Sequence, residues 1–529
     1  MADEAPQRFS SAEKQMNSTH RVVVNTLTTY VRSVFGAGLA LFTSRWVLNA
    51  LGQTDFGLYN VVGSILFFVT FFSATFAAAS SRYFAYSIGE GNLEDTNRWF
   101  NAALLLHALL AAVLILGGWP IGEYFIKYHL TIPPDRLAAS IYVFRLSLIS
   151  AFFFMVSIPM VSMLTAKQLI YEQAVIGLFQ SLLTFVFAYI LIRGVEGDRL
   201  LFYAQYTVAI NVFIQSVYML RAVAVLPECK LVFQRLFDMG RFRKIISFSG
   251  WHATNGIGFA LSNQGIAVVL NLFFGPKANA AYGIANQVTN QTSQLSTSLV
   301  GAISPEITSI EGSGDRRRML SLSNRASKFS TLMVLLFVVP ILFDTDYLLK
   351  LWLKTPPDYA APFCRIILLA FLLDKITIGY EIAINAIGNV SVLFGVTGLL
   401  RIITLPLGYL FVLGGQNPVF CVAAILIMNA AITLFRVYWA GKVLDEPFQD
   451  WFMNVAIKCV VASMAASLLA LVPFLLMEPS FIRLVLITLM STSGMALVGW
   501  KFSLNDRERE YIYENGKKAV LKFKGFLNV

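Results

Sequence analysis

Two arginines fall within stretches that are otherwise apolar. Arg32 lies in VVVNTLTTYVRSVFGAGLALF (residues 22–42), and Arg145 lies in SIYVFRLSLIS. A guanidinium stays charged at physiological pH, and its planar donors match phosphate oxygens bidentately, so it suits a pyrophosphate group. An arginine at the centre of a bilayer costs roughly 3 kcal/mol on insertion scales. Each arginine therefore needs an anionic partner, either a carboxylate on another helix or an anionic substrate.

The neighbours of these arginines favour the substrate. Asn25 and Gly36 share a helix face with Arg32, and Tyr142 lies one turn before Arg145. The apolar segments of the same half of the chain hold no convincing mid-membrane Asp or Glu. We therefore predict that Arg32 and Arg145 bind pyrophosphate, with Asn25 and Tyr142 beside them as contacts for an attached glycan.

Uncharged polar side chains mark two later segments, 245–272 and 279–304. Amide-rich faces hydrogen-bond sugar hydroxyls or hold helices together, and the pattern leaves both interpretations open. The predicted glycan contacts are His252, Asn255, Asn263, Asn286, Asn290 and Gln294.

A third group is acidic. Asp374 and Glu381 are two helical turns apart in the segment 362–386, which places them on one face of a helix. An intramembrane carboxylate pair can carry H⁺ or Na⁺ and so couple transport to an ion gradient. The alternative is local pairing of Asp374 with Lys375 or Arg401.

The elements that must hold these residues are membrane helices. The 529-residue chain is 57% hydrophobic and only 13% charged, too little charge to coat soluble domains. With about 20 apolar residues per crossing, the sequence predicts an all-α integral membrane protein with fourteen spans. They cover 22–46, 57–81, 98–120, 138–164, 173–193, 200–222, 245–272, 279–304, 327–350, 362–386, 391–413, 417–440, 454–476 and 480–501.

Loop charge sets the orientation. With the N-terminus inside, about 26 of the 41 Lys and Arg residues lie in inner loops and tails and about 8 in outer ones. Both termini are thus predicted to be cytoplasmic, and the net charge of +11 indicates anionic lipid rather than nucleic acid. The sequence contains no phosphate-binding GxxxxGK[ST] loop, no HExxH and no paired cysteines, and its one DxD (Asp344, Asp346) lies in a short outer loop. We expect no enzymatic activity, no metal and no cofactor.

Two short matches indicate an internal duplication. Val-Leu-Asn at 47–49 recurs at 269–271, and Ser-Ile at 87–88 recurs at 309–310, so both matches have the same offset along the chain. A repeat six spans long gives two lobes of the same orientation, as in some secondary transporters. The expected organisation is a cytoplasmic tail (1–20), an N-lobe (21–222), a basic cytoplasmic linker (223–244), a C-lobe (245–442), two further spans (443–502) and a basic cytoplasmic tail (503–529).

With these features in place, the chain resembles the oligosaccharide flippases of the multidrug/oligosaccharidyl-lipid/polysaccharide superfamily. The stretches that carry the resemblance are RSVFGAGLALFTSRWVLNALGQTDFGLYN (32–60), SGWHATNGIGFALSNQGIAVVLNLFFGP (249–276) and AAYGIANQV (280–288).

The resemblance implies two six-helix lobes around a cationic central cavity and alternating access. It also implies a polyprenyl-pyrophosphate-linked oligosaccharide moved from the inner to the outer face of a bacterial inner membrane, beside polysaccharide polymerase machinery. The alternative is a cation-coupled multidrug antiporter of the same superfamily, which should place acids in its first-lobe cavity. A membrane glycosyltransferase, which needs a catalytic acid in a large outer loop, and a non-transporting scaffold fit less well.

Overall fold

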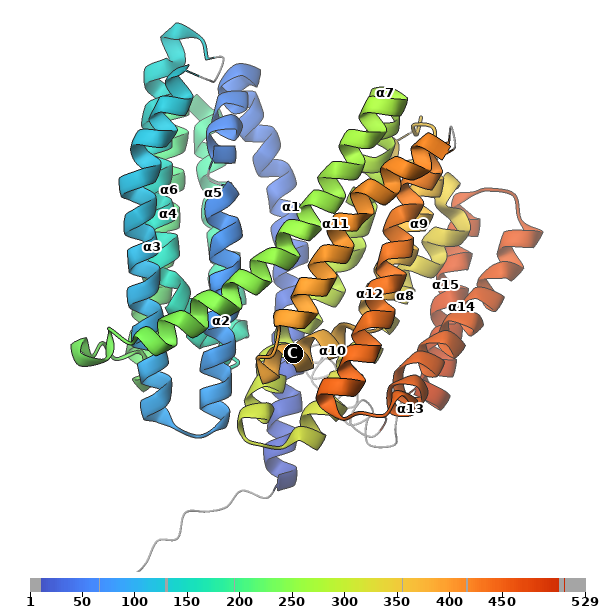
Figure 1. Cartoon of the computed structure of the whole chain (residues 1–529). Helices are drawn as coiled ribbons and strands as arrows, with labels where there is room; N and C mark the ends of the chain where they lie inside the picture. The colour runs from blue at the N-terminus through green and yellow to red at the C-terminus, as the bar shows by residue number, and fades with distance from the viewer. Residues whose placement is uncertain are drawn as a thin grey trace, which may run out of the picture. The chain divides into compact units, whose positions relative to one another are not determined.

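A computed structural model describes residues 11–65, 67–128, 132–194, 196–353, 355–414, 417–503 and 509. The secondary structure assigned within these ranges is helical (Figure 1). The first six long helices are α1 (Ser11–Ile65), α2 (Phe67–Gly89), α3 (Leu93–Tyr128), α4 (Leu137–Ala166), α5 (Ile170–Gly194) and α6 (Arg199–Val225). Here α1 packs against α5, and α4 packs against α2, α3 and α6.

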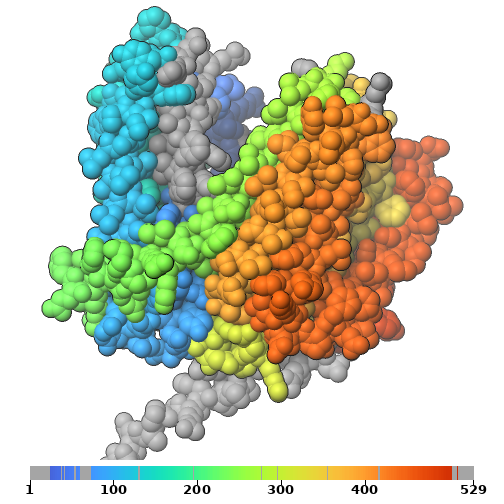
Figure 2. All heavy atoms as spheres, in the orientation of Figure 1, coloured from blue at the N-terminus to red at the C-terminus, as the bar shows by residue number. Residues whose placement is uncertain are grey.

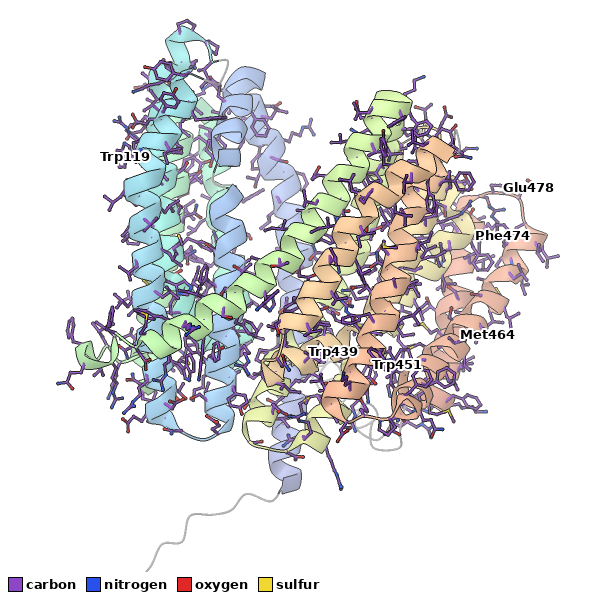
Figure 3. The ribbon with its side chains drawn as sticks, in the orientation of Figure 1. Trp119, Trp439, Trp451, Met464, Phe474 and Glu478 are labelled. Carbon is purple, nitrogen blue, oxygen red and sulfur yellow. The ribbon has the colours of Figure 1, made fainter. Side chains whose placement is uncertain are left out.

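The second half of the chain begins with the longest helix. It comprises α7 (Met239–Gly312), α8 (Arg316–Leu353), α9 (Ala360–Lys375), α10 (Ile378–Ile387), α11 (Ser391–Gly414), α12 (Pro418–Leu444), α13 (Phe448–Trp451), α14 (Ile457–Leu476) and α15 (Phe481–Val498). α9 packs against α12, and α14 packs against α15. Figure 3 labels Met464 and Phe474 on α14 and Glu478 in the turn to α15.

Every predicted span is helical over most of its described residues. Eleven helices of the described chain are long and apolar enough to cross a membrane. The three predicted spans that fall short are 57–81, which includes an undescribed residue, 279–304, which is rich in amides, and 362–386, which is broken between α9 and α10. The chain is thus a multi-pass membrane protein. α1 begins at Ser11, before the predicted end of the N-terminal tail, and most of the predicted C-terminal tail lies outside the described residues.

Two glycines give α1 and α7 the same kink. Gly52 has φ 77° and ψ 173°, and Gly275 has φ 76° and ψ −174°, a backbone conformation that side chains disfavour. The interval between them along the chain equals that between two further positive-φ glycines, Gly91 and Gly314. The duplication is therefore visible in the backbone, with an offset one residue longer than the Ser-Ile match suggested.

The same offset relates a reciprocal helix contact. A side chain at Gly89 would lie 1.8 Å from the carbonyl oxygen of Ser309, and one at Gly312 would lie 2.0 Å from that of Tyr86. The offset converts Gly89 into Gly312 and Tyr86 into Ser309, so each copy supplies one glycine and one carbonyl oxygen to the contact. The end of α2 and the end of α7 thus meet across a local pseudo-twofold axis, with glycine in both contacts.

The chain divides into two compact units. Unit 1 comprises 1–254, 298–319 and 385–391, and unit 2 comprises 255–297, 320–384 and 392–529. Unit 1 takes in the predicted N-lobe and linker together with short segments of the predicted C-lobe. The lobe boundaries of the sequence analysis stay a prediction. Within unit 1 the start of α7 lies over α2 and α3, as the space-filling view shows (Figure 2).

Candidate functional site

Arg32 is a cation of unit 1 that has no carboxylate beside it. Its side chain is exposed on α1 and forms no ion pair with any described residue. Gly177 of α5 makes room for it, because a side chain there would lie 2.9 Å from Arg32 Cδ. The hydroxyl of Tyr218 on α6 lies close enough to interact electrostatically with the Arg32 guanidinium. An exposed, unpaired guanidinium inside a spanning helix is suited to meeting a mobile anion.

Arg145 has a carboxylate partner, so the expectation that this half offers none is wrong. Its Nε donates to Glu123 Oε1 at 2.7 Å, and its guanidinium lies 5.5 Å from the centre of the Trp119 ring (Figure 3). Glu123 was assigned to a loop because the predicted span ended at residue 120, whereas α3 continues to Tyr128. About half of the Arg145 side chain remains exposed.

The two arginines cannot hold one pyrophosphate in this structure. Along the axis of α4, Arg145 lies about 31 Å from the last residue of the helix, Ala166, because an α-helix rises about 1.5 Å per residue. Arg32 lies level with Gly177, which is about 10 Å along the axis of α5 from the first residue of that helix, Ile170. The end of α4 and the start of α5 meet at one turn, so both distances are measured from the same level. The two cations are therefore about 20 Å apart along the helix axes. The prediction that Arg32 and Arg145 together bind one pyrophosphate is therefore wrong for this structure. That each arginine alone binds an anion stays a prediction.

The companions of the arginines make internal bonds. Asn25 is buried, donates to the carbonyl oxygen of Gln168 at 3.0 Å, and accepts from the backbone N–H of Tyr171 at 3.0 Å. It ties α1 to the α4–α5 turn, which favours a structural role over glycan contact. Tyr142 is partly exposed and accepts from Gln205 Nε2 at 3.1 Å, leaving its hydroxyl hydrogen for another acceptor.

His252 lies beside a small polar cavity within unit 1. Its Nε2 is 3.1 Å from Asn385 Oδ1, and both residues line a cavity of about 160 Å³ with Arg82, Ser304 and Thr308. Arg82 donates to the carbonyl oxygens of Asn385 and Ala386 at 3.1 and 3.0 Å, in the last turn of α10. Arg82 was not among the predicted site residues, because the predicted span ended at residue 81.

The amide stripe of α7 divides into two parts within unit 2. Asn255 accepts from Thr397 of α11, Asn263 accepts from Tyr282 across the kink of α7, and Asn286 bonds to Tyr282 within one helix, so all three have internal partners. Asn290 and Gln294 are exposed farther along the helix. Exposed amides are unfavourable against hydrocarbon and therefore indicate a watery face. Only this second part fits the predicted glycan contacts.

The acids of unit 2 belong to a closed charge cluster. Arg436 of α12 is 1% exposed; it donates to Asp374 Oδ1 at 2.9 Å and to Glu381 Oε2. Lys375 Nζ and Arg401 Nη2 lie 3.0 and 3.6 Å from the Asp374 carboxylate. The local pairing considered as the alternative to ion coupling is present, and three cations surround two acids.

The cluster also supports an interruption in the predicted tenth span. The α-helix stops at Lys375 and resumes at Ile378, so the expected single helix face is broken. Arg436 Nη1 lies 3.3 Å from the Asp374 carbonyl oxygen and 3.5 Å from Thr377 Oγ1 at this break. Arg436 was missed because it belongs to another helix, far from both of its partners along the chain. The presence of Arg436 in an otherwise apolar segment could have indicated a buried ion pair.

The DxD acids are likewise occupied in unit 2. Asp344 is buried and pairs with Arg483 of α15, and Asp346 accepts from Arg365 at 2.7 Å. Phe474, labelled in Figure 3, lies 5.3 Å under the Arg483 guanidinium. The first pair attaches α15 to α8 and the second attaches α9 to α8, which gives the two acids a structural role.

Comparisons with known proteins agree with this architecture. The family model described as polysaccharide biosynthesis protein matches residues 22–311, and the model described as MatE matches residues 257–410. Comparison with curated protein sequences gives no significant match.

Solved transporters share the fold. An outward-facing multidrug resistance MATE family transporter of the MOP superfamily is 14% identical, with coverage of 83% of this chain and 99% of that one and a TM-score of 0.70. A MOP superfamily transporter from Pyrococcus furiosus, described as having a binding pocket of reverse polarity, is 14% identical, with coverage of 83% and 100% and a TM-score of 0.68. MATE in complex with MaL6 is 14% identical, with coverage of 81% and 96% and a TM-score of 0.68. At such identities the likeness concerns the fold alone.

Proposed function

Because the chain belongs to the polysaccharide biosynthesis protein family, within the multidrug/oligosaccharidyl-lipid/polysaccharide superfamily, we propose that it is a lipid-linked oligosaccharide flippase. Its substrate would be an oligosaccharide repeat unit on a polyprenyl-pyrophosphate carrier. The transfer would run from the cytoplasmic to the outer face of a bacterial inner membrane, with both termini of the chain in the cytoplasm. The product would then be available to polysaccharide polymerase machinery.

The observation that carries the proposal is the exposed Arg32 guanidinium. A permanent cation within a spanning helix is stable there only with an anion or water beside it. No described carboxylate fills that role. A pyrophosphate does so for as long as the substrate is bound, and its release leaves a hydrated cation. Such a cation favours binding of the pyrophosphate without trapping it permanently.

Two further features support a lipid-linked glycan as the substrate class. Asn290 of unit 2 is exposed, and its amide matches sugar hydroxyls in hydrogen-bonding capacity. The polyprenyl chain needs no dedicated cavity, since it is as apolar as the surrounding lipid. The transfer moves a molecule without making or breaking covalent bonds, so we infer that the protein is not an enzyme.

The test is glycan export by cells that depend on Arg32→Gln at matched protein levels. Loss of one charge-assisted contact to phosphate, worth roughly 1.5–3 kcal/mol, should lower export about tenfold or more. Arg32→Lys should retain part of the activity, because it keeps the charge and loses the bidentate geometry.

Arg145→Gln is the matched comparison, because Arg145 is the other predicted anion ligand of unit 1 but is already paired. It removes the same charge from the same unit, but from an arginine that already has Glu123 as a partner. Export should fall much less in this variant. Full export by Arg32→Gln would remove the anion-site assignment, and equal losses in both variants would show a general demand for positive charge.

The MatE match over residues 257–410 favours one other candidate, a cation-coupled multidrug antiporter. Such a pump needs a carboxylate free to meet a cation, whereas Asp374 and Glu381 are both bonded to Arg436. Accumulation of a cationic dye in cells lacking the protein, reversed by its expression, would support the antiporter. Coupling to H⁺ or Na⁺ through these two acids remains a proposal, and it would require the cluster to open during transport.

A further inference from the structure

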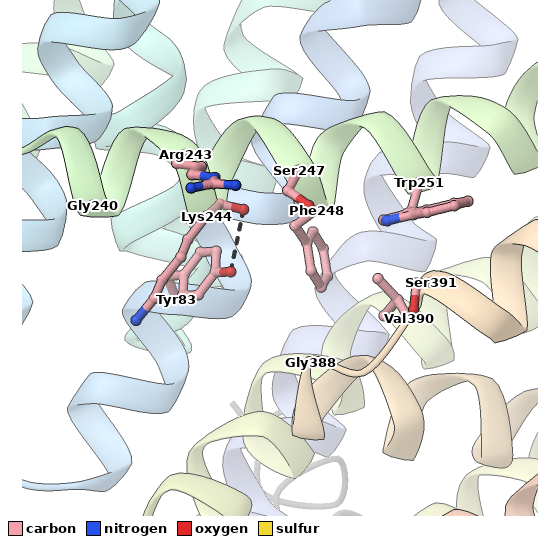
Figure 4. A pocket seen from close by; sticks show the side chains of 10 residues that line it. All are labelled: Tyr83, Gly240, Arg243, Lys244, Ser247, Phe248, Trp251, Gly388, Val390 and Ser391. Atoms are coloured by element: carbon pink, nitrogen blue, oxygen red, sulfur yellow. Dashed lines mark hydrogen bonds between the residues drawn. The ribbon is translucent and has the colours of Figure 1, made fainter.

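A second basic site lies at the start of α7, apart from Arg32. A cavity of about 560 Å³ opens there, within the range of about 300–1,000 Å³ usual for ligand pockets. Figure 4 shows Arg243, Lys244 and Trp251 on one wall, Tyr83 of α2 beside them, and the α10–α11 connection opposite. All the lining residues belong to unit 1.

The cations of this cavity are not neutralised by nearby acids. Among the described residues neither Arg243 nor Lys244 forms an ion pair, and both are exposed. Two acids of the neighbouring segments, Asp95 and Asp238, are both bonded to Arg241. Two adjacent basic residues are thus left to meet an anion, while the third satisfies the carboxylates.

The remaining walls suit a phosphate. Ser391 is the first residue of the 24-residue helix α11, and the N-terminus of such a helix adds N–H donors and positive potential to the cationic side chains. Tyr83 stacks on Trp99 at a centroid distance of 4.2 Å and donates to the Lys244 carbonyl oxygen, which holds the wall in place (Figure 4). Trp251 is 39% exposed at the rim.

The surroundings indicate that the phosphate belongs to a lipid. Phe237, Met239 and Ile246 expose 70%, 63% and 50% of their surface along the start of α7. Aromatic and basic side chains together are typical of the boundary between hydrocarbon and water. The first residues of α7 also belong to the basic segment 223–244, which the charge distribution predicts to be cytoplasmic.

We propose that this basic pocket binds the phosphate group of a membrane lipid, with the hydrocarbon of the lipid lying against the exposed apolar side chains at the start of α7. The phosphate has two possible sources: an anionic phospholipid of the inner leaflet, or the diphosphate of a polyprenyl carrier before transfer. The proposal requires only the lipid phosphate and does not depend on transport of a glycan.

The experiment uses the full-length protein in detergent and native mass spectrometry to measure the dissociation constant of the first bound lipid. The probes are phosphatidylglycerol, polyprenyl diphosphate and inorganic pyrophosphate. Arg243→Gln/Lys244→Gln should weaken binding of the lipid probes about tenfold or more, the factor expected for one lost charge-assisted contact. Ser391→Asp places an acid in the pocket at a helix N-terminus, where it favours folding, and should weaken binding similarly.

Arg317→Gln is the matched control. Arg317 is an exposed cation of unit 1 at the start of α8, outside the cavity, and has no ion pair among the described residues. This variant should bind lipid as the unaltered protein does. Tighter binding of phosphatidylglycerol would identify the bilayer as the source, and tighter binding of polyprenyl diphosphate would identify the carrier.

Two results would overturn the site: equal lipid affinity in the double variant and the Arg317 control, or binding of inorganic pyrophosphate as tight as that of either lipid. Neither outcome bears on the proposed export function, because that function is tested through Arg32 in cells.

Discussion

In unit 1 the Arg32 guanidinium is exposed on α1 with no described carboxylate beside it, whereas in unit 2 that of Arg436 is enclosed between two carboxylates. Both arginines occur in apolar helices, so their sequence settings look alike. Their surroundings assign opposite tasks. A saturated buried charge holds a fold in one arrangement, while an unsaturated exposed charge is available to a ligand.

The contrast concerns these two arginines and does not extend to every junction between helices. Unit 2 joins helices by buried ion pairs, as Arg483 does with Asp344. Unit 1 also uses ion pairs, such as Arg241 of α7 with Asp95 of α3. In addition, the ends of α2 and α7 meet in unit 1 by close backbone approach at glycine, a junction that needs no charge.

The largest effect should follow from removing the central cation of unit 2. Arg436→Met leaves two carboxylates without their main partner in a buried site, and breaking such a pair costs about 3–5 kcal/mol. The purified variant should show a markedly lower melting temperature or fail to accumulate. An unchanged melting temperature would refute the structural role of the cluster.

A combined variant sharpens this test. Adding Asp374→Asn and Glu381→Gln to Arg436→Met removes the stranded charges, so much of the lost stability should return. Glycan export by this triple variant then separates two roles. Retained export means that the cluster is structural, whereas lost export in a stable protein means that its acids carry the coupling ion.

A smaller effect should follow from crowding the uncharged junction of unit 1. Gly312→Val places a side chain about 2.0 Å from the Tyr86 carbonyl oxygen, and overpacking of this kind typically costs about 1–3 kcal/mol. Thermal unfolding in detergent measures the change. Gly301→Val, on the same helix with open space around it, is the control and should be tolerated better. Equal losses at the two glycines would contradict the close-contact interpretation.

The smallest change in stability should come from Arg32. Because its side chain is exposed and forms no ion pair with a described residue, Arg32→Met should alter the free energy of unfolding by no more than about 0.5 kcal/mol. The melting temperature of the purified protein gives the answer. A large loss of stability would show that Arg32 has a structural partner. Its role would then resemble that of Arg436.

The sequence predicted the helices well because the length of an apolar run and the thickness of a bilayer are both local quantities. It also revealed the duplication, although the kinks at Gly52 and Gly275 show an offset one residue longer than the matches indicated. The error arose because Val-Leu-Asn is separated from its glycine by one more residue in the second copy. Two short matches gave the wrong register there, and the positive-φ glycines correct it.

Partners were harder to predict than elements. Glu123 was hidden by a span that ended too early, and Arg436 by its distance from Asp374 along the chain. The amides looked equivalent in sequence, yet Asn255 bonds to another helix and Asn263 bonds across the kink of α7, whereas Asn290 is exposed. Helical spacing indicates which residues share a face, but it does not indicate what that face meets.

Taken alone, the sequence determined that this is a membrane protein built from apolar helical segments with an internal repeat. It also showed that arginines lie within some of these segments, where a charge in hydrocarbon is costly. Only the tertiary structure decided which arginine is neutralised. A pairing between residues dozens of positions apart depends on how helices pack. Composition sets the total charge of a helix, and packing alone determines whether that charge is left available for a ligand.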